Sequence, residues 1–260
     1  MKRRLLRLFV FVLLAVTLTA LLVVPVSAAP GDELIGGGTG SIDPSLQINI
    51  NGEGSDTVRI LVLMTILMLL PSLLIMMTSF VRIIIVFSLL RQALGIQQTP
   101  PNQVLIGLAL FLTLFIMRPV ITEINEKAYI PYSDGVISTT EFLDNASDPL
   151  RTFMLEQTRA DDVQMFYTIS GEERPDDPGE YDMLVVIPSF ILSELRRAFT
   201  IGFLLFIPFL IIDMVVSSAL MSMGMMMLPP ITISLPFKLM LFVLVDGWGL
   251  LIRALVSTYT

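Results

Sequence analysis

The residues of this sequence most able to do chemistry are charged residues inside long apolar segments: Arg82, Glu194, Asp213, Lys238 and Asp246. A charge in a membrane interior costs about 2.5 to 3.5 kcal/mol even on permissive insertion scales. We therefore expect these side chains to face protein or a wet passage and to form intramembrane ion pairs. Asp213 and Lys238 are the first candidate pair, because they would face each other across a helical hairpin. Such a pair either fixes the register of two helices or relays protons.

Other catalytic chemistry is restricted by what the composition lacks. The sequence has no cysteine and no histidine, which excludes disulfides, thiolate nucleophiles, histidine metal sites and Ser-His-Asp triads. Among enzymes, this leaves a membrane enzyme that uses the carboxylates of Asp213 and Glu194, and little else in the sequence supports one. Residues 36–40 are glycine-rich, but the Lys-Ser/Thr pair of a phosphate-binding loop does not follow them. We therefore expect no enzyme, no cofactor and no metal.

The overall balance of residues indicates a membrane protein. Of the 260 residues, 54% are hydrophobic and 15% are charged, a surplus of apolar side chains that one soluble domain of this size could not bury. Acidic residues outnumber basic ones by 23 to 16, which argues against binding nucleic acid. The partners should be protein or lipid.

The first 57 residues are interpreted as a signal peptide (1–28) followed by a flexible leader (29–57). Four basic residues form a positive cap at the start, and an almost unbroken apolar run over residues 5–24 is followed by Pro25 and small residues. The basic residues are Lys2, Arg3, Arg4 and Arg7. This is the pattern of a secretory signal, and a first transmembrane helix is the alternative. Residues 29–56 turn to Gly, Ser, Asn and Asp without periodicity, as flexible segments do.

Residues 58–121 are predicted to form a first long helical hairpin. Residues 60–81 carry no charge and would span about 33 Å as a helix kinked at Pro71. The helical pattern continues past Arg82 to Arg91. Residues 97–102 then predict a turn with Asn102 as N-cap, and a second apolar helix over residues 104–117 that Arg118 and Pro119 close.

Residues 122–182 are predicted to form an acidic, water-facing domain. We count 15 acidic and 4 basic residues there, and prolines should break it into short helices, with a loop over residues 171–180. The breaking prolines are Pro131, Pro149, Pro175 and Pro178. Four membrane crossings, starting outside after signal cleavage, would place Arg82 and Arg91 near the cytoplasm and this domain outside. Arg118, Arg196 and Arg197 would then lie outside, against the positive-inside rule.

Residues 183–260 are predicted to form a second hairpin of two helices, over about residues 189–228 and 236–256, divided by prolines. Five of the chain's 16 methionines fall within residues 221–227. Methionine side chains adapt to irregular surfaces, so this cluster at a hairpin tip is interpreted as a pore gasket, with ordinary packing as the alternative. The expected gasket residues are Met223, Met225, Met226 and Met227, and the expected hinge residues are Gly224, Pro229 and Pro230.

Several long motifs, in order, make the sequence resemble the FliP family of flagellar export-gate proteins. They are residues 80–85, 89–95, 97–102 and 188–195, the methionine loop, and residues 236–248. The resemblance covers about residues 60–256. Virulence-type secretion systems have a homologous subunit, but the signal peptide and the large acidic domain make this sequence more similar to the flagellar proteins. Departures from the usual pattern fall at Ser189, Arg196, Arg197 and Gly249.

The resemblance implies an all-α, membrane-associated subunit of helical hairpins. It implies that five copies assemble with FliQ and FliR into a helical channel in the inner membrane at the flagellar basal body, near FlhA and FlhB, and pass unfolded flagellar proteins. In the family the gasket falls on Met225, Met226 and Met227. From the residues alone, an ion-coupled small-solute transporter using Asp213 and Asp246 stays open as an alternative.

Overall fold

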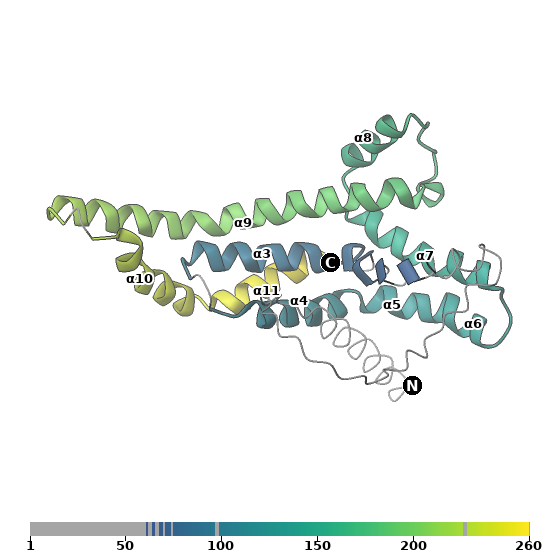
Figure 1. The fold of residues 1–260 in the computed structure, drawn as a ribbon, viewed down its shortest axis with the longest axis horizontal. Helices are drawn as coiled ribbons and strands as arrows, with labels where there is room; N and C mark the ends of the chain where they lie inside the picture. Colours follow the sequence, from purple (N-terminus) through teal and green to yellow (C-terminus); the bar gives the residue numbers. More distant parts are fainter. Residues whose placement is uncertain are drawn as a thin grey trace, which may run out of the picture. The chain divides into compact units, whose positions relative to one another are not determined.

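The computed structural model describes residues 61, 64–65, 68–69, 71–73, 75–96, 99–225 and 228–259. The expected signal peptide and leader lie outside the described residues. The part of the chain that is described folds into helices and connecting turns and contains no strand, which confirms the all-α prediction. Figure 1 shows these helices from α3 to α11.

The first half of the described chain contains α3 (Phe80–Ala93), α4 (Asn102–Ile116), α5 (Arg118–Ile124), a π-helical turn (Asn125–Tyr129) and α6 (Ile130–Ser133). The second half contains α7 (Thr139–Glu156), α8 (Ala160–Ser170), a 3₁₀ turn (Pro178–Glu180), α9 (Met183–Ser222), α10 (Pro230–Leu244) and α11 (Gly247–Ser257).

The first hairpin differs from its prediction at three points. The described residues up to Met76 are helical, but residues 77–79 form a turn and a new helix begins at Phe80, so no single helix runs to Arg91. Asn102 is the first residue of α4 rather than its N-cap, and its side chain accepts a hydrogen bond from Arg91. The helical path also continues after a turn at Met117, with Pro119 in the first turn of α5, where proline needs no amide hydrogen.

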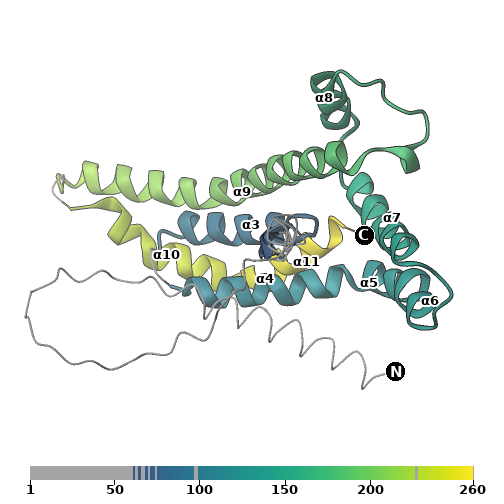
Figure 2. The ribbon, with the colours of Figure 1, turned by 45° about the vertical axis from the view of Figure 1, so that its right-hand side comes forward.

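The helix α9 is the longest described element, and the other helices pack along it. Its N-terminus is capped by the side chain of Asp182, which accepts from the amide of Leu184. In Figures 1 and 2, α3 lies beside α9, and α10 and α11 follow on the same side. Arg82 of α3 contacts Glu194 of α9, and Leu89, farther along α3, lies against Gly202, farther along α9. The two helices therefore run in the same direction.

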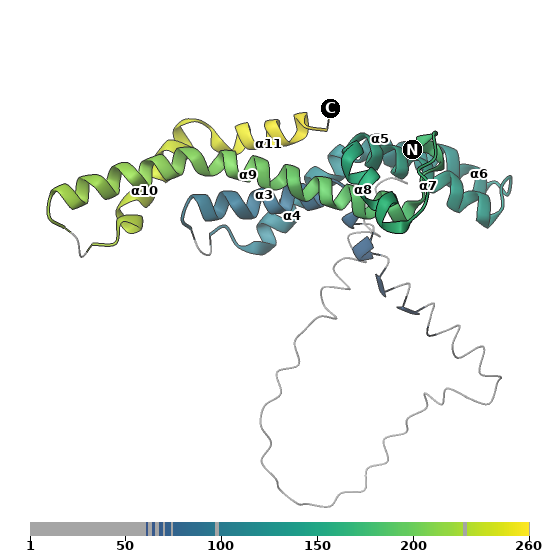
Figure 3. The same ribbon diagram turned by 90° about the horizontal axis from the view of Figure 1, so that it is seen from above.

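Two groups of buried apolar residues hold these helices together. The first joins α3, α4, α9, α10 and α11, and on α3 it uses Ile83, Val86, Phe87 and Leu90, the spacing of one helical face. The second joins α5, α7, α8 and the start of α9 through residues such as Phe153, Tyr167 and Phe190. The α7–α8 segment (residues 139–170) therefore packs on the first turns of α9. The helices α3, α4, α10 and α11 pack farther along it. Figure 3 shows this succession along α9 from another side.

Prolines break the chain less than predicted. Pro149 lies inside α7, and Pro236 lies inside α10 rather than before it. The expected helix over residues 236–256 is instead interrupted at Asp246, whose backbone is left-handed (φ 50°). There α10 and α11 meet at a bend of 62°.

Among the described residues, only α9 is both long and apolar enough to cross a membrane alone. Two bent pairs also qualify if each counts as one span: Asn102–Ile116 with Arg118–Ser133 (57°), and Pro230–Leu244 with Gly247–Ser257. These make up to three of the four expected crossings, and the expected span over residues 60–81 is described only in part.

Candidate functional site

The methionine loop connects α9 to α10. The last turn of α9 closes around Gly224 (φ 73°), with hydrogen bonds from the amide of Met225 to the carbonyl of Leu220 and from the amide of Gly224 to the carbonyl of Met221. This Schellman arrangement needs a left-handed residue, which glycine adopts at little cost. Pro229 then precedes α10 and Pro230 is its first residue. The expected hinge residues therefore stand where the chain reverses.

The described methionines of this loop are exposed. Met223 is 70% exposed and Met225 is 45% exposed, and Met221 is exposed as well. Met226 and Met227 lie outside the described residues. Because residues 214–237 contain no charged side chain, the loop and the helix ends beside it offer a contacting molecule a soft and uncharged surface.

Asp213 and Lys238 close the base of this uncharged stretch. Lys238 Nζ lies 2.6 Å from Asp213 Oδ2 and also donates to the carbonyl oxygen of Ala93 (3.3 Å). Ser234 donates its hydroxyl to Asp213 Oδ1 (2.6 Å). The structure thus brings together the first candidate pair, with Lys238 buried and Asp213 half-buried. The ammonium joins the end of α3 to both helices of the second hairpin.

A second cluster, which we call the Arg82–Glu194 cluster, lies farther back between α3 and α9. Arg82 and Glu194 are both completely buried, and the guanidinium binds both carboxylate oxygens, with Arg82 Nε 2.9 Å from Glu194 Oε2. Arg82 also donates to Thr258 Oγ1 (2.8 Å) and to Gln157 Oε1 (3.3 Å). Arg197 donates to the same oxygen of Gln157 (2.7 Å).

Tyr259 completes the Arg82–Glu194 cluster. Its ring lies over the Arg82 guanidinium, 3.9 Å from centroid to Cζ, and its hydroxyl donates to Glu194 Oε2 (2.7 Å). Burial raises the pKa of the Tyr259 hydroxyl, and the Glu194 carboxylate raises it further. The hydroxyl therefore keeps its proton and acts as a donor. The hydrogen bonds between side chains of this cluster all join residues that are distant in sequence.

Asp246 forms its ion pair with a residue that the sequence analysis did not name. It is 71% exposed and pairs with an equally exposed Arg253 of α11 (3.2 Å). Its carboxylate lies beside Gly249, where an added Cβ would stand 2.2 Å from Asp246 Oδ2 and require this exposed side chain to move. Asp246 is thus a residue of the α10–α11 bend rather than a buried charge.

Two further departures from the family pattern, Ser189 and Arg196, also make contacts. Ser189 donates to the carbonyl oxygen of Val185 (2.7 Å), and Arg196 binds the buried Asp162 of α8, with Nη2 3.0 Å from Oδ1. Ser193 donates to the other carboxylate oxygen of Asp162 (2.6 Å). Sequence reasoning named Arg82 and Glu194 without pairing them, and it missed Gln157, Asp162 and Tyr259, because no local pattern marks a contact made across such sequence distances.

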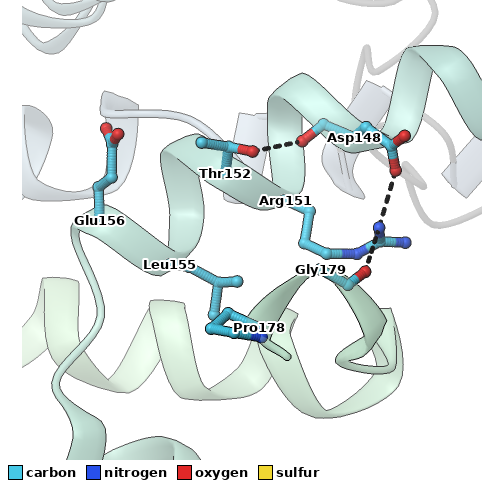
Figure 4. Close-up of a pocket in the computed structure, with 7 residues that line it drawn as sticks. All are labelled: Asp148, Arg151, Thr152, Leu155, Glu156, Pro178 and Gly179. Carbon is cyan, nitrogen blue, oxygen red and sulfur yellow. Dashed lines mark hydrogen bonds and ion pairs between the residues drawn. The ribbon is translucent and has the colours of Figure 1, made fainter. Parts of the chain in front are cut away.

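Two hollows were not expected from the sequence. One, of about 390 Å³, lies between α7 and the 3₁₀ turn. There Arg151 Nη1 donates to Asp148 Oδ1 and to the carbonyl oxygen of Gly179, as Figure 4 shows. The other is a groove of about 500 Å³ along α9 and α10 below the methionine loop, lined only by apolar residues such as Val215, Leu220 and Phe237. In the described part of the chain, no three potential metal ligands gather.

Comparison with known proteins identifies relatives along most of the chain. The model of the FliP family matches residues 63–255. The flagellar biosynthetic protein FliP of Bacillus subtilis (strain 168) is 51% identical over 205 residues, covering 79% of this chain and 93% of the relative.

Two further relatives carry the same name. That of Pectobacterium carotovorum subsp. carotovorum is 54% identical over 211 residues (80% of this chain, 82% of the relative), and that of Aquifex aeolicus (strain VF5) is 50% identical over 220 residues (83% and 92%). The family model spans nearly all of both helical hairpins and the segment between them, so the chain belongs to the FliP family.

Proposed function

We propose that this chain is a pore-forming core subunit of the flagellar protein export gate, a type III secretion apparatus, and passes unfolded flagellar proteins across the inner membrane during flagellum assembly. Membership of the FliP family, whose named members are flagellar biosynthetic proteins, supports the flagellar role. The chain has no catalytic activity of its own in this proposal, so an associated ATPase or the proton gradient drives transport.

The exposed, uncharged methionine loop carries the pore proposal. A channel that passes many different unfolded chains must close around surfaces of changing shape, and unbranched methionine side chains conform to such surfaces. Met223, Met225, Met226 and Met227 form the gasket in this proposal, and Gly224, Pro229 and Pro230 let the loop bend. The Asp213–Lys238 pair holds the loop's base in a fixed position.

The surroundings of the loop favour assembly with other chains. Large apolar side chains along α9, including Phe203, Leu210 and Met214, are exposed, and the apolar groove beside α10 is open. Such surface is covered by lipid or by other subunits in a stable protein. We propose five copies of this chain together with FliQ and FliR, next to FlhA and FlhB, with the acidic segment outside the cytoplasm.

Alanine substitution of the methionines tests the gasket. Replacing Met223, Met225, Met226 and Met227 by Ala removes the long side chains that fill the constriction, so the membrane should leak small ions when the variant is expressed. Replacing Met165, an exposed methionine of α8, is the matched control and should cause no leak. A tight membrane together with normal export in the fourfold variant would contradict the gasket.

The mass of the detergent-solubilised complex tests the rival function. A small-solute transporter would work as a monomer or dimer, whereas an export gate is a large assembly of several kinds of subunit. The comparisons give the transporter no support. An active transporter of monomeric mass would contradict the export-gate proposal.

A further inference from the structure

Gln157 lies at the point where three parts of the fold meet. It follows α7 directly, is buried, and its side-chain oxygen accepts from Arg82 of α3 (3.3 Å) and from Arg197 of α9 (2.7 Å). Two guanidinium groups from two helices thus share one amide oxygen of the α7–α8 segment. Hydrogen bonds from charged donors are stronger than neutral ones.

The charges around this oxygen are unequal. Arg82 and Arg197 bring two positive charges, and Glu194 supplies one negative charge. Within the described residues, no carboxylate lies at ion-pair distance from Arg197. Like charges repel, and Arg82 is completely buried while Arg197 is half-buried, so the oxygen of Gln157 is the group that allows both guanidinium groups to point to one place.

The α7–α8 segment is fixed to α9 at a neighbouring point as well. The backbone amide of Arg159 donates to Ser193 Oγ (3.1 Å). The buried carboxylate of Asp162 binds Ser193 and Arg196. These contacts dock α8 on α9 but do not touch α3. Gln157 is therefore the residue of the segment that connects this docking to the contact between α3 and α9.

We propose that Gln157 is a positioning residue that couples the docking of the α7–α8 segment on α9 to the packing of α3 against α9. Loosening at Gln157 opens both contacts together. Since α9 continues to the methionine loop, a molecule that moves the α7–α8 segment would alter the helix pair leading to the pore. That last consequence rests on the proposed function, whereas the coupling itself is a property of the packing.

Two buried thiols report the two contacts separately, because the chain has no native cysteine. Ala93→Cys places a thiol in the buried core at the far end of α3, about 16 Å along the helix from Arg82. Val163→Cys places one under α8. In full-length protein purified in detergent, the rate of alkylation by N-ethylmaleimide measures how often each site opens.

Gln157→Leu should speed alkylation at both positions by roughly tenfold, because the charged Arg197 loses its acceptor and faces the Arg82 guanidinium with nothing between them. Gln157→Glu keeps an oxygen acceptor and balances the second arginine, so both rates should return close to those of the parent. Gln164→Leu, an exposed glutamine of α8, is the matched control and should change neither rate. Faster alkylation at Val163→Cys alone would overturn the coupling, because Gln157 would then only dock α8.

A double variant tests the coupling if the Gln157→Leu protein does not fold well enough to be purified. Gln157→Leu with Arg197→Leu removes the acceptor and the second positive charge together, while the Arg82–Glu194 pair remains. This protein should accumulate and protect the Ala93→Cys thiol as the parent does. Failure of the double variant to protect that thiol would overturn the proposal. Neither readout requires export, so the result stands apart from the test of the gasket.

Discussion

Arg82 and Glu194 are two full charges that lie completely out of water between α3 and α9. Burial of each charge is costly, and their mutual attraction repays that cost only with good geometry and further hydrogen bonds. Here both carboxylate oxygens are bound by the guanidinium, and Thr258, Gln157 and Tyr259 satisfy the remaining groups. The pair therefore specifies one arrangement of the two helices.

Loss of one partner should be far more harmful than loss of both. Glu194→Leu leaves the Arg82 charge buried alone and should destabilise the protein by about 3 to 5 kcal/mol. The double variant with Arg82→Leu should recover much of this loss, because no unpaired charge remains. Thermal unfolding of the detergent-solubilised variants measures the difference. Arg253→Leu removes an exposed pair and is the control, and a double variant as unstable as Glu194→Leu would contradict the argument.

At the residue scale, sequence reasoning succeeded where neighbours are set by a hairpin. Asp213 and Lys238 flank a single turn of the chain, so their contact follows from antiparallel helices. Arg82 and Glu194 were recognised as buried charges but not paired, because 112 positions separate them and the chain topology alone does not bring them together. Gln157 is uncharged and belongs to no sequence motif, so only its contacts with Arg82 and Arg197 in the folded chain reveal its role.

At the scale of helices, α3 and α9 approach closely at Gly202. A Cβ there would lie 2.2 Å from Leu89 Cδ1 and 3.2 Å from Leu89 Cβ. The absence of a side chain at Gly202 thus sets the distance between the two helices, and it does so about two turns from the Arg82–Glu194 cluster.

Gly202→Ala should destabilise the protein even though alanine favours a helix by about 1 kcal/mol, because overpacking costs about 1 to 3 kcal/mol. Leu89→Ala in the same chain should relieve the clash. Gly107→Ala in α4 is a matched control, since nothing lies within 4 Å of its added Cβ, and it should stabilise. Thermal unfolding compares the three, and a stabilised Gly202→Ala protein would show that the helices can separate freely.

The first turn of α7 should respond to acid. The amide of Ser138 donates to Glu141 Oε2 (2.7 Å), and the Ser138 hydroxyl accepts from the amide of Glu141. These bonds lower the pKa of Glu141 below its ordinary value near 4.5, the backbone bond contributing most. Their stabilising effect is therefore present above that ordinary value and is lost as the pH falls through the lowered pKa.

Hydrogen exchange in the first turn of α7 measures this loss between about pH 3 and pH 6, around the usual glutamate range. Protection should fall toward the acid end in the parent, after correction for the intrinsic exchange rate. Glu141→Gln has no group to titrate there, so its corrected protection should stay level. Equal pH profiles for the two proteins would refute the role of the capping carboxylate.

The ends of α9 were both predicted about six residues too late. Asp182 caps its start ahead of the expected residue 189, and the turn at Gly224 ends it before the expected residue 228. Pro149 and Pro236 were expected to break helices and instead lie inside them, because tertiary packing offsets the lost hydrogen bond. The bend at Asp246 was missed, since the apolar pattern runs through it without interruption.

At the scale of the whole molecule, the described helices carry their polar and acidic surface near the start of α9 and their exposed apolar surface along the rest of it. The acidic α7–α8 segment packs at the start of α9, and exposed apolar side chains follow along it. Accessibility of new cysteines should reveal the topology. In intact spheroplasts, Glu173→Cys in the loop after α8 should react with a membrane-impermeant maleimide, because we place the acidic segment outside.

Gln92→Cys, exposed near the end of α3, is the matched position on the expected cytoplasmic side and should react only after the membrane is opened. Comparison of labelling before and after permeabilisation checks both positions. Labelling of Gln92→Cys in sealed cells, with Glu173→Cys unreactive, would require the opposite orientation.

The run without charged side chains between Asp213 and Lys238 has an electrical consequence. Work done by a transmembrane potential is proportional to the charge that moves through it, about 2.3 kcal/mol per elementary charge at 100 mV. Residues 214–237 carry no such charge, and the two ions that bound them neutralise each other. Voltage alone therefore exerts no net pull on the tip, so in the proposed gate the seal is displaced mechanically by the polypeptide in transit and stays shut when the membrane is energised but idle.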